Sequence, residues 1–372
     1  MQSIRDLFKT KTKPNPKKLR EAAEIGDLQN VKALITAGAE LNAARGDGAT
    51  ALILAAQNGH VEVAQCLVTA GAELNAKTTR GYPVGMTALM WAAYNGDVAV
   101  AQFLVTAGAE LEAKATSWPH YGMTALILAA YNGHVAAAQC LVTAGAELNA
   151  KQEDGSTALM WAAQMGDVAA AQCLVTAGAE LEAKNSWRKT ALMFAAQNGR
   201  VETAQYLATA GAELNAKDDD GKTALMIAAQ NGSVAVAQCL VTAGAELNAA
   251  RPDGMTALMW AAYSGHLETA QFLVTAGAEL EAKANNGTTA LMFARKNKHE
   301  EMVKYLEDAT DKVLAMINAA KQNNIPELKR LLDTGTNINA KDSRGMTALM
   351  CAAGEGHLET AQCLVTAGAE LN

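Results

Sequence analysis

Residues 155–167 read Gly-Ser-Thr-Ala-Leu-Met-Trp-Ala-Ala-Gln-Met-Gly-Asp, and variants of this stretch recur along most of the chain. The Thr-Ala-Leu at its centre occurs nine times, and five consecutive intervals between these threonines are 33 residues long. Self-similarity at such a period predicts a solenoid, because one unit is too short to bury its own apolar face. The threonines are Thr50, Thr87, Thr124, Thr157, Thr190, Thr223, Thr256, Thr289 and Thr347.

Each unit has the pattern of two short helices followed by an extended loop, which we call a finger. In the unit that starts at Gly155, the first helix is expected from about Ala158 to Gln164, and Gly166 permits a sharp reversal into the second. The second helix is expected to end near Gly178, since glycine past a helix end readily adopts a left-handed conformation.

Residues 155–167, together with Ala-Gly-Ala-Glu-Leu-Glu-Ala-Lys at 177–184, resemble the ankyrin repeat. The resemblance covers residues 18–372 in about eleven units and implies an all-α ankyrin-repeat solenoid of helix-turn-helix units with extended finger loops. Alanine and mostly methionine replace the proline and histidine of the family's usual Thr-Pro-Leu-His segment. Methionine packing is therefore expected to compensate for the lost histidine.

The spacing of the repeats predicts three parts: a basic flexible leader at 1–17, a main array at 18–310 and a second short array at 311–372. The interval from Thr289 to Thr347 is 58 residues, which is one period plus 25, so one unit has lost its finger. We interpret the region 308–311 as a junction and a hinge, with a drifted repeat as an equal alternative.

Charge separates the leader from the solenoid. Residues 1–20 carry a formal charge of +6, which leaves −13 for the remainder of a chain whose net charge is −7. The leader is interpreted as a solvated segment, with a docking arm as the alternative. Regularly placed glutamates would repel phosphate, so a basic protein partner is favoured over nucleic acid. No apolar run approaches the ~18 residues of a membrane helix, and a cytoplasmic location is the default expectation.

Two fingers are four residues longer than the rest, between Lys77 and Gly85 and between Lys114 and Gly122. Insertions in repeat proteins usually map to loops on one face, often the binding face. Aromatic residues concentrate there and recur at the finger that follows Lys184. The candidate partner-binding residues of the fingers are Tyr82, Pro83, Trp118, His120, Tyr121, Trp187 and Arg188.

A second candidate surface is the concave face, where the ends of the first helices carry a ladder of tyrosine and glutamine. Tyrosine offers a large rigid contact area and amides adapt their hydrogen bonds, as in antibody paratopes. An inherited repeat consensus is the alternative explanation. The tyrosines of this ladder are Tyr94, Tyr131 and Tyr263.

Two kinds of unit are present. Three units carry tryptophan on the first helix and, 21 residues later, glutamate where other full units carry asparagine. Duplication of a two-unit block is favoured over a selected functional pairing. The pairs are Trp91 with Glu112, Trp161 with Glu182, and Trp260 with Glu281.

The sequence offers no recognisable catalytic, metal-binding or cofactor-binding motif. Five cysteines occupy one repeated position, which predicts reduced residues of the core, and Cys351 is expected to be buried. Four histidines follow the glycine between the helices and are expected to be structural. We therefore predict a monomeric, non-enzymatic protein-interaction scaffold without cofactors, and a variant of this prediction makes it an inhibitor or a host-directed effector. The alternative is a structural spacer or a fragment of a larger multidomain repeat protein.

Overall fold

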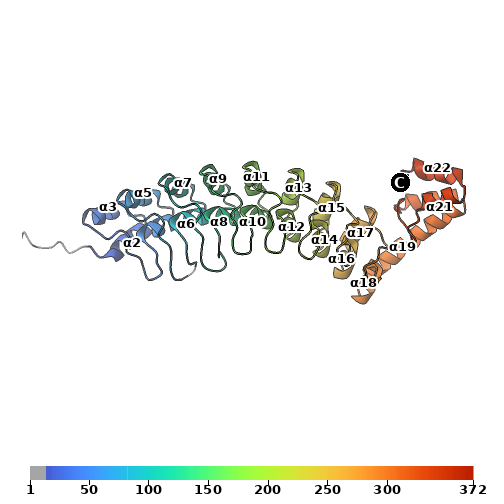
Figure 1. Ribbon diagram of the computed structural model, residues 1–372, viewed down its shortest axis with the longest axis horizontal. Coiled ribbons are helices and arrows are strands. Elements are labelled where there is room, and N and C mark those ends of the chain that lie inside the picture. The colour runs from blue at the N-terminus through green and yellow to red at the C-terminus, as the bar shows by residue number, and fades with distance from the viewer. Residues whose placement is uncertain (1–13, 82, 372) are drawn as a thin grey trace, which may run out of the picture. The chain divides into compact units, whose positions relative to one another are not determined.

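The computed structural model describes residues 14–81 and 83–371. In these residues all regular structure is helical, and the helices form repeated helix-turn-helix units joined by fingers (Figure 1). The predicted all-α solenoid is confirmed. The chain divides into two compact units, Met1–Ser186 and Trp187–Asn372, which are described separately below.

In the first unit, the second helices of the repeats form one row and the first helices form another, and the fingers extend beyond the first helices (Figure 1). Each first helix packs on the next, and each second helix does the same. The first helices are α2 (Pro16–Glu24), α4 (Ala51–Gln57), α6 (Ala88–Asn95), α8 (Ala125–Tyr131) and α10 (Ala158–Met165). The second helices are α3 (Leu28–Thr36), α5 (Val61–Thr69), α7 (Val98–Thr106), α9 (Val135–Thr143) and α11 (Val168–Thr176).

The second unit begins with the same arrangement and then departs from it at one long helix. Its first helices are α12 (Ala191–Gln197), α14 (Ala224–Gln230), α16 (Ala257–Ser264), α18 (Ala290–Lys296) and α21 (Ala348–Gly354). Its second helices are α13 (Val201–Thr209), α15 (Val234–Thr242), α17 (Leu267–Thr275), α20 (Ile325–Asp333) and α22 (Leu358–Thr366). The long helix is α19 (Glu300–Lys321).

The repeated threonine starts the first helix of its unit. Thr87 Oγ1 accepts a hydrogen bond from the backbone N–H of Met90 at 3.2 Å, and Thr124 Oγ1 accepts one from Ile127 at 3.4 Å. This bond satisfies one of the backbone donors that a helix N-terminus leaves free. The same cap forms at Thr50, Thr223, Thr256, Thr289 and Thr347.

Small residues let the first helices approach closely. The alanine pair Ala92 and Ala93 on α6 is fully buried, as are the corresponding pairs of most repeats. The methionines that replace the family's histidine are buried in five units, as expected. Met292 and Met350, next to the irregular region, are instead exposed by 50% and 39%.

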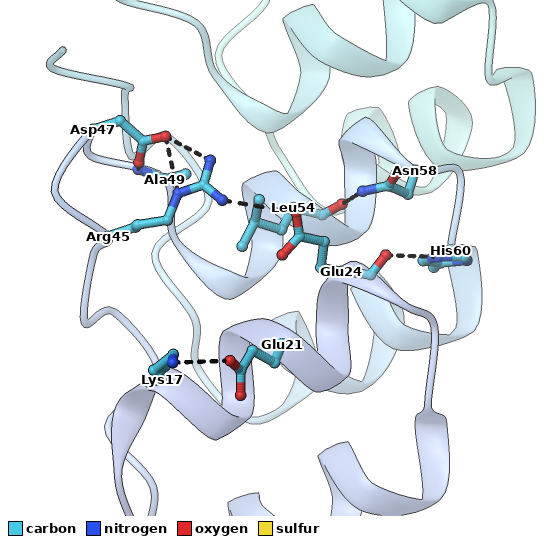
Figure 2. Close-up of polar contacts among 9 residues, drawn as sticks. All are labelled: Lys17, Glu21, Glu24, Arg45, Asp47, Ala49, Leu54, Asn58 and His60. Carbon is cyan, nitrogen blue, oxygen red and sulfur yellow. Dashed lines mark hydrogen bonds and ion pairs between the residues drawn. The ribbon is translucent and has the colours of Figure 1, made fainter. Parts of the chain in front are cut away.

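Histidines after the inter-helix glycine link neighbouring repeats. His60 Nε2 donates to the backbone oxygen of Glu24 at 3.2 Å, across one repeat (Figure 2). Such a histidine also packs against the inter-helix glycine of the preceding repeat: Gly96 has a φ of 75°, and a Cβ there would lie 2.6 Å from Nδ1 of His134. The structural role expected for these histidines is therefore confirmed at His60 and recurs at His266 and His357.

The first repeat begins slightly earlier than the sequence pattern indicates. Asn15 caps α2, and Pro16 and Lys17 already belong to this helix, where Lys17 pairs with Glu21 at 3.3 Å (Figure 2). Proline is favoured in the first helical turn because its missing N–H has no partner there in any case. Most of the predicted leader, residues 1–13, lies outside the described residues.

α19 fuses the second helix of one repeat with the first helix of the next. It is 22 residues long and packs on α17, α18, α20 and α21. Loss of the finger removed the loop that separates these helices elsewhere. The region Asp308–Asp311 lies inside this continuous helix, so it contains no loop hinge. The boundary near residue 310 between a main and a second array remains a prediction.

Candidate protein-binding surface

Backbone hydrogen bonds tie the long fingers to each other. We call residues 77–86 the second finger and residues 114–123 the third finger. Thr116 N–H donates to the backbone oxygen of Val84 at 2.9 Å, and Val84 N–H donates to Ser117 Oγ at 2.7 Å. Within the second finger, Thr78 Oγ1 donates to the backbone oxygen of Pro83 at 3.0 Å. These bonds fix the positions of the two inserted segments relative to each other.

The structure separates the predicted residues of these fingers into exposed and buried groups. Trp118 is 79% exposed and Tyr121 is 46% exposed, so both are accessible to a partner. Pro83 and His120 are buried, His120 with only 5% of its surface exposed, so neither side chain offers a direct contact. Tyr82 lies outside the described residues.

His120 belongs to a continuous row of aromatic side chains, which we call the aromatic row. It runs from α6 through the third finger to α8 and α10, and all its neighbours meet edge to face. Edge-to-face aromatic pairs stabilise a structure by more than the burial of their apolar surface alone. The successive centroid distances are 5.8 Å from Trp91 to Tyr94, 5.3 Å to His120, 5.9 Å to Tyr131 and 5.1 Å to Trp161.

Burial decides the protonation of His120. Taking an imidazolium out of water disfavours the charged form, and this lowers the pKa of His120 from its usual 6.5. Nδ1 of this ring is buried and has no hydrogen-bond partner among the described residues. The neutral ring therefore acts as an apolar link that holds the third finger against Tyr94 and Tyr131.

A separate aromatic cluster lies in the second unit. Tyr263, 46% exposed, sits between Trp260 and Phe293, with ring centroids 5.9 and 6.1 Å away. Two cations cover the Trp260 ring: Nζ of Lys222 lies 4.3 Å and the guanidinium carbon of Arg251 lies 5.5 Å from its centroid. Cations are attracted to the electron-rich face of an indole.

The predicted pair Trp187 and Arg188 lies at the first finger of the second unit. Trp187 is 54% exposed, and its backbone oxygen accepts from Asp219 N–H of the next finger at 3.1 Å. Arg188 has a φ of 55° and lies with its Nε 3.9 Å from Oδ1 of Asp219. Trp187, Phe194 and Asp220 help line a shallow depression of about 330 Å³.

The sequence reasoning missed the tryptophans of the first helices as surface residues. Trp91, Trp161 and Trp260 are only half-buried, and each joins one of the two aromatic groups. The spacing of the aromatic residues could have indicated this surface, because Trp91 precedes Tyr94 by three residues and Trp260 precedes Tyr263 by three. Residues three apart on a helix lie on the same face. Phe293, which has no such partner on its own helix, gave no signal.

The cysteines offer little chemistry. All six are free, and Cys351 is buried as expected. The expectation that the five repeated cysteines belong to the core is wrong, because they are only half-buried on the second helices. Burial nevertheless raises the pKa of the Cys140, Cys173 and Cys239 thiols, which disfavours the reactive thiolate.

Residues 14–81 and 83–371 contain neither a metal-binding cluster nor a membrane-spanning helix. No cluster of three or more histidine, cysteine, aspartate or glutamate side chains there could hold a metal ion. None of the helices in that part of the chain combines the length and the apolar character needed to cross a membrane.

Comparison with known families agrees with the geometry. A family model described as ankyrin repeats in three copies matches four overlapping segments, and one described as ankyrin repeats in many copies matches a fifth. The segments are 19–115, 114–185, 177–251 and 244–314 for the first model and 316–365 for the second. The chain therefore belongs to the ankyrin repeat family. Ankyrin repeats are generally protein–protein interaction modules and typically not enzymes.

Individual relatives share only short segments with this chain. It is 43% identical to the mitochondrial disaggregase of Homo sapiens and 41% identical to that of Bos taurus, each over 63 residues, which is 17% of this chain and 9% of the relative. It is 39% identical to the potassium channel AKT2/3 of Arabidopsis thaliana over 56 residues, 15% of this chain and 7% of that protein. The chain thus spans less than a tenth of the length of these relatives.

Proposed function

We propose that this chain is a non-enzymatic scaffold that binds a partner protein through the tips of its fingers and the adjoining aromatic side chains. The observation that carries the proposal is the third finger. It presents Trp118 and Tyr121 to solvent while His120, between them, anchors the finger in the aromatic row. Exposed tryptophan and tyrosine on a rigid support are the side chains that dominate the binding energy of protein interfaces.

In the second unit, the exposed Trp187 is a further candidate contact of the same kind. The net charge of −7 favours a partner with positive net charge. The proposal includes a monomeric chain in the cytoplasm. An inhibitory or host-directed role is a narrower version, which requires that the chain reduce the activity of the captured partner.

The test is quantitative affinity capture from the source cell with a Trp118→Ala, Tyr121→Ala, Trp187→Ala variant. Ile25→Ala is the matched control, because Ile25 is an exposed apolar residue (73%) between α2 and α3, away from the fingers. Circular dichroism establishes that helicity is unchanged. We expect a partner that wild type and Ile25→Ala retain and the triple variant loses.

Equal capture by all three proteins, or no capture by any, contradicts the proposal. The alternative, a structural spacer within a larger repeat protein, would then be favoured, because a spacer does not depend on exposed aromatic side chains at its fingers.

A further inference from the structure

The groove beside Trp260 in the second unit contains buried hydrogen-bond donors that lack an acceptor. It has a volume of about 520 Å³ and is lined by Arg251, Trp260, Tyr263, Phe293 and neighbouring finger residues. Two of its nitrogen atoms, Nε1 of Trp260 and Nε of Arg251, are buried and have no hydrogen-bond partner in the part of the chain that the structure describes. Both are donors that cannot accept, so each lacks an acceptor.

A second repeat of the same chain shows what is missing. Trp161 occupies the position of Trp260, and its Nε1 donates to Oε1 of Gln152 at 3.1 Å. Gln152 in turn donates from Nε2 to Oδ1 of Asp154 at 2.8 Å. Nine residues before the tryptophan, where that repeat has Gln152, the Trp260 repeat has Arg251. A glutamine accepts and donates, whereas an arginine only donates.

Arg251 keeps one of the two contacts that glutamine makes. Its guanidinium lies 3.5 Å from Oδ2 of Asp253, which corresponds to Asp154, but it offers no atom that could accept from the indole. Arginine at the position of Gln152 therefore leaves the Trp260 N–H without a partner and adds a positive charge beside it.

The charges around the groove are arranged asymmetrically. The cations lie against the indole, with only 20% of the Arg251 and 15% of the Lys222 side chain exposed. The acids nearest to them, Asp253 and Asp220, are 51% and 69% exposed, and the Lys222–Asp220 distance is 4.0 Å. Solvent weakens ion pairs of this kind. The buried part of the site is thus rich in donors and positive charge.

We propose that this groove binds a carboxylate side chain, glutamate or aspartate, of a partner polypeptide. The carboxylate accepts from Nε1 of Trp260 and pairs with the Arg251 guanidinium, since a carboxylate supplies acceptors without competing donors. To admit it, the long side chains of Lys222 and Arg251 shift on the indole, and Nζ of Lys222 releases Oε1 of Gln230, to which it donates at 2.9 Å. An apolar residue next to the carboxylate packs on Tyr263 and Phe293, whose rings flank the groove.

This inference deepens the protein-binding function proposed above and rests on it, because it gives the chemistry of one contact. It describes a local site within an acidic array. An acidic residue at this point is compatible with a partner whose net charge is positive.

The test follows the indole N–H signals of the ¹⁵N-labelled full chain by NMR, assigned with single tryptophan-to-phenylalanine variants. The probe is a capped tripeptide, phenylalanine-glutamate-phenylalanine, and its control carries glutamine in place of glutamate. We expect the glutamate peptide to shift the Trp260 signal with at least tenfold higher affinity than the glutamine peptide. The Trp161 signal should not move, since its N–H already has an acceptor.

The decisive variant is Arg251→Gln, which installs the residue that the Trp161 repeat already tolerates. We expect it to reduce the affinity for the glutamate peptide at least tenfold. The inference is overturned if Trp260 does not respond, if both peptides shift it equally, if Arg251→Gln responds like wild type, or if inorganic phosphate gives the same shift. In each of those cases, loss of a captured partner in the Trp118, Tyr121 and Trp187 variant would still support the proposed function.

Discussion

The imidazole of His120 meets the ring of Tyr94 edge to face, with 5.3 Å between the ring centroids. This contact joins an inserted finger residue to the end of a first helix, so the insertion is part of the packed structure. Its consequence is that Trp118 and Tyr121, on either side of His120, project from a supported finger. Such preorganisation reduces the entropy lost on binding.

The stability of the third finger should depend on pH through His120. Because burial lowers its folded pKa, the unfolded chain binds more protons once the pH falls below the usual value of 6.5. We expect this group's contribution to be fully present above that pH and to decline below it, by at most about 1.4 kcal/mol per pH unit. Urea unfolding of wild type and His120→Gln between pH 7.5 and 5 measures this. A wild-type slope no steeper than that of the variant would contradict the prediction.

The threonine cap should be worth a measurable amount of stability. Thr124→Ala removes the acceptor for Ile127 N–H, and we expect a loss of about 1 kcal/mol in the free energy of unfolding. Thr124→Ser keeps the hydroxyl and should lose clearly less. Equal losses for the two variants in urea unfolding would show that the methyl group, and not the cap, matters.

Glutamate and asparagine should be interchangeable at the position after the second helix where the side chain accepts a hydrogen bond from the backbone of the next repeat. Asn75 Oδ1 accepts from Glu110 N–H at 2.9 Å, and Glu112 Oε1 accepts from Glu147 N–H at 2.8 Å. We expect Glu112→Ala to cost about 1 kcal/mol of stability, because that N–H loses its acceptor. Glu112→Asn should stay close to wild type in thermal unfolding. Loss of stability in Glu112→Asn equal to that in Glu112→Ala would mean that the two kinds of unit differ functionally at this position.

The continuity of α19 can be tested at Asp308. Proline there removes a helical hydrogen bond and clashes with the preceding turn, so Asp308→Pro should destabilise the second unit by about 3 kcal/mol or more. Asp308→Ala loses only the ion pair with Lys312, and we expect a cost of a few tenths of a kcal/mol. If urea unfolding shows that proline is tolerated, this region behaves as a hinge and not as a helix.

The repeated parts of the fold could be predicted from the sequence in detail. Helix boundaries near Ala158 and Gln164, the reversal at Gly166 and the structural role of His60 all follow from residues that recur at one period. Recurrence is informative because each unit contacts equivalent neighbouring units, so residues at equivalent positions pack in the same surroundings.

The irregular parts could not be predicted in this way. The spacing from Thr289 to Thr347 predicts that a finger is lost, but whether the helices on either side of it bend apart or fuse into α19 depends on what they pack against. Met292 and Met350 are exposed although the repeated pattern predicts that they are buried, because their packing neighbours differ from those of the regular repeats.

The sequence by itself determined the class of protein, the number and length of the repeats and the placement of insertions, because these are encoded in short-range patterns that each unit repeats. Only the tertiary structure decided which aromatic side chains are accessible. Trp118 and His120 lie two residues apart in one finger, yet one is 79% exposed and the other 5%. Burial of His120 depends on Tyr94 and Tyr131, which the stacking of separate repeats brings next to it. The sequence of the finger alone does not indicate that contact.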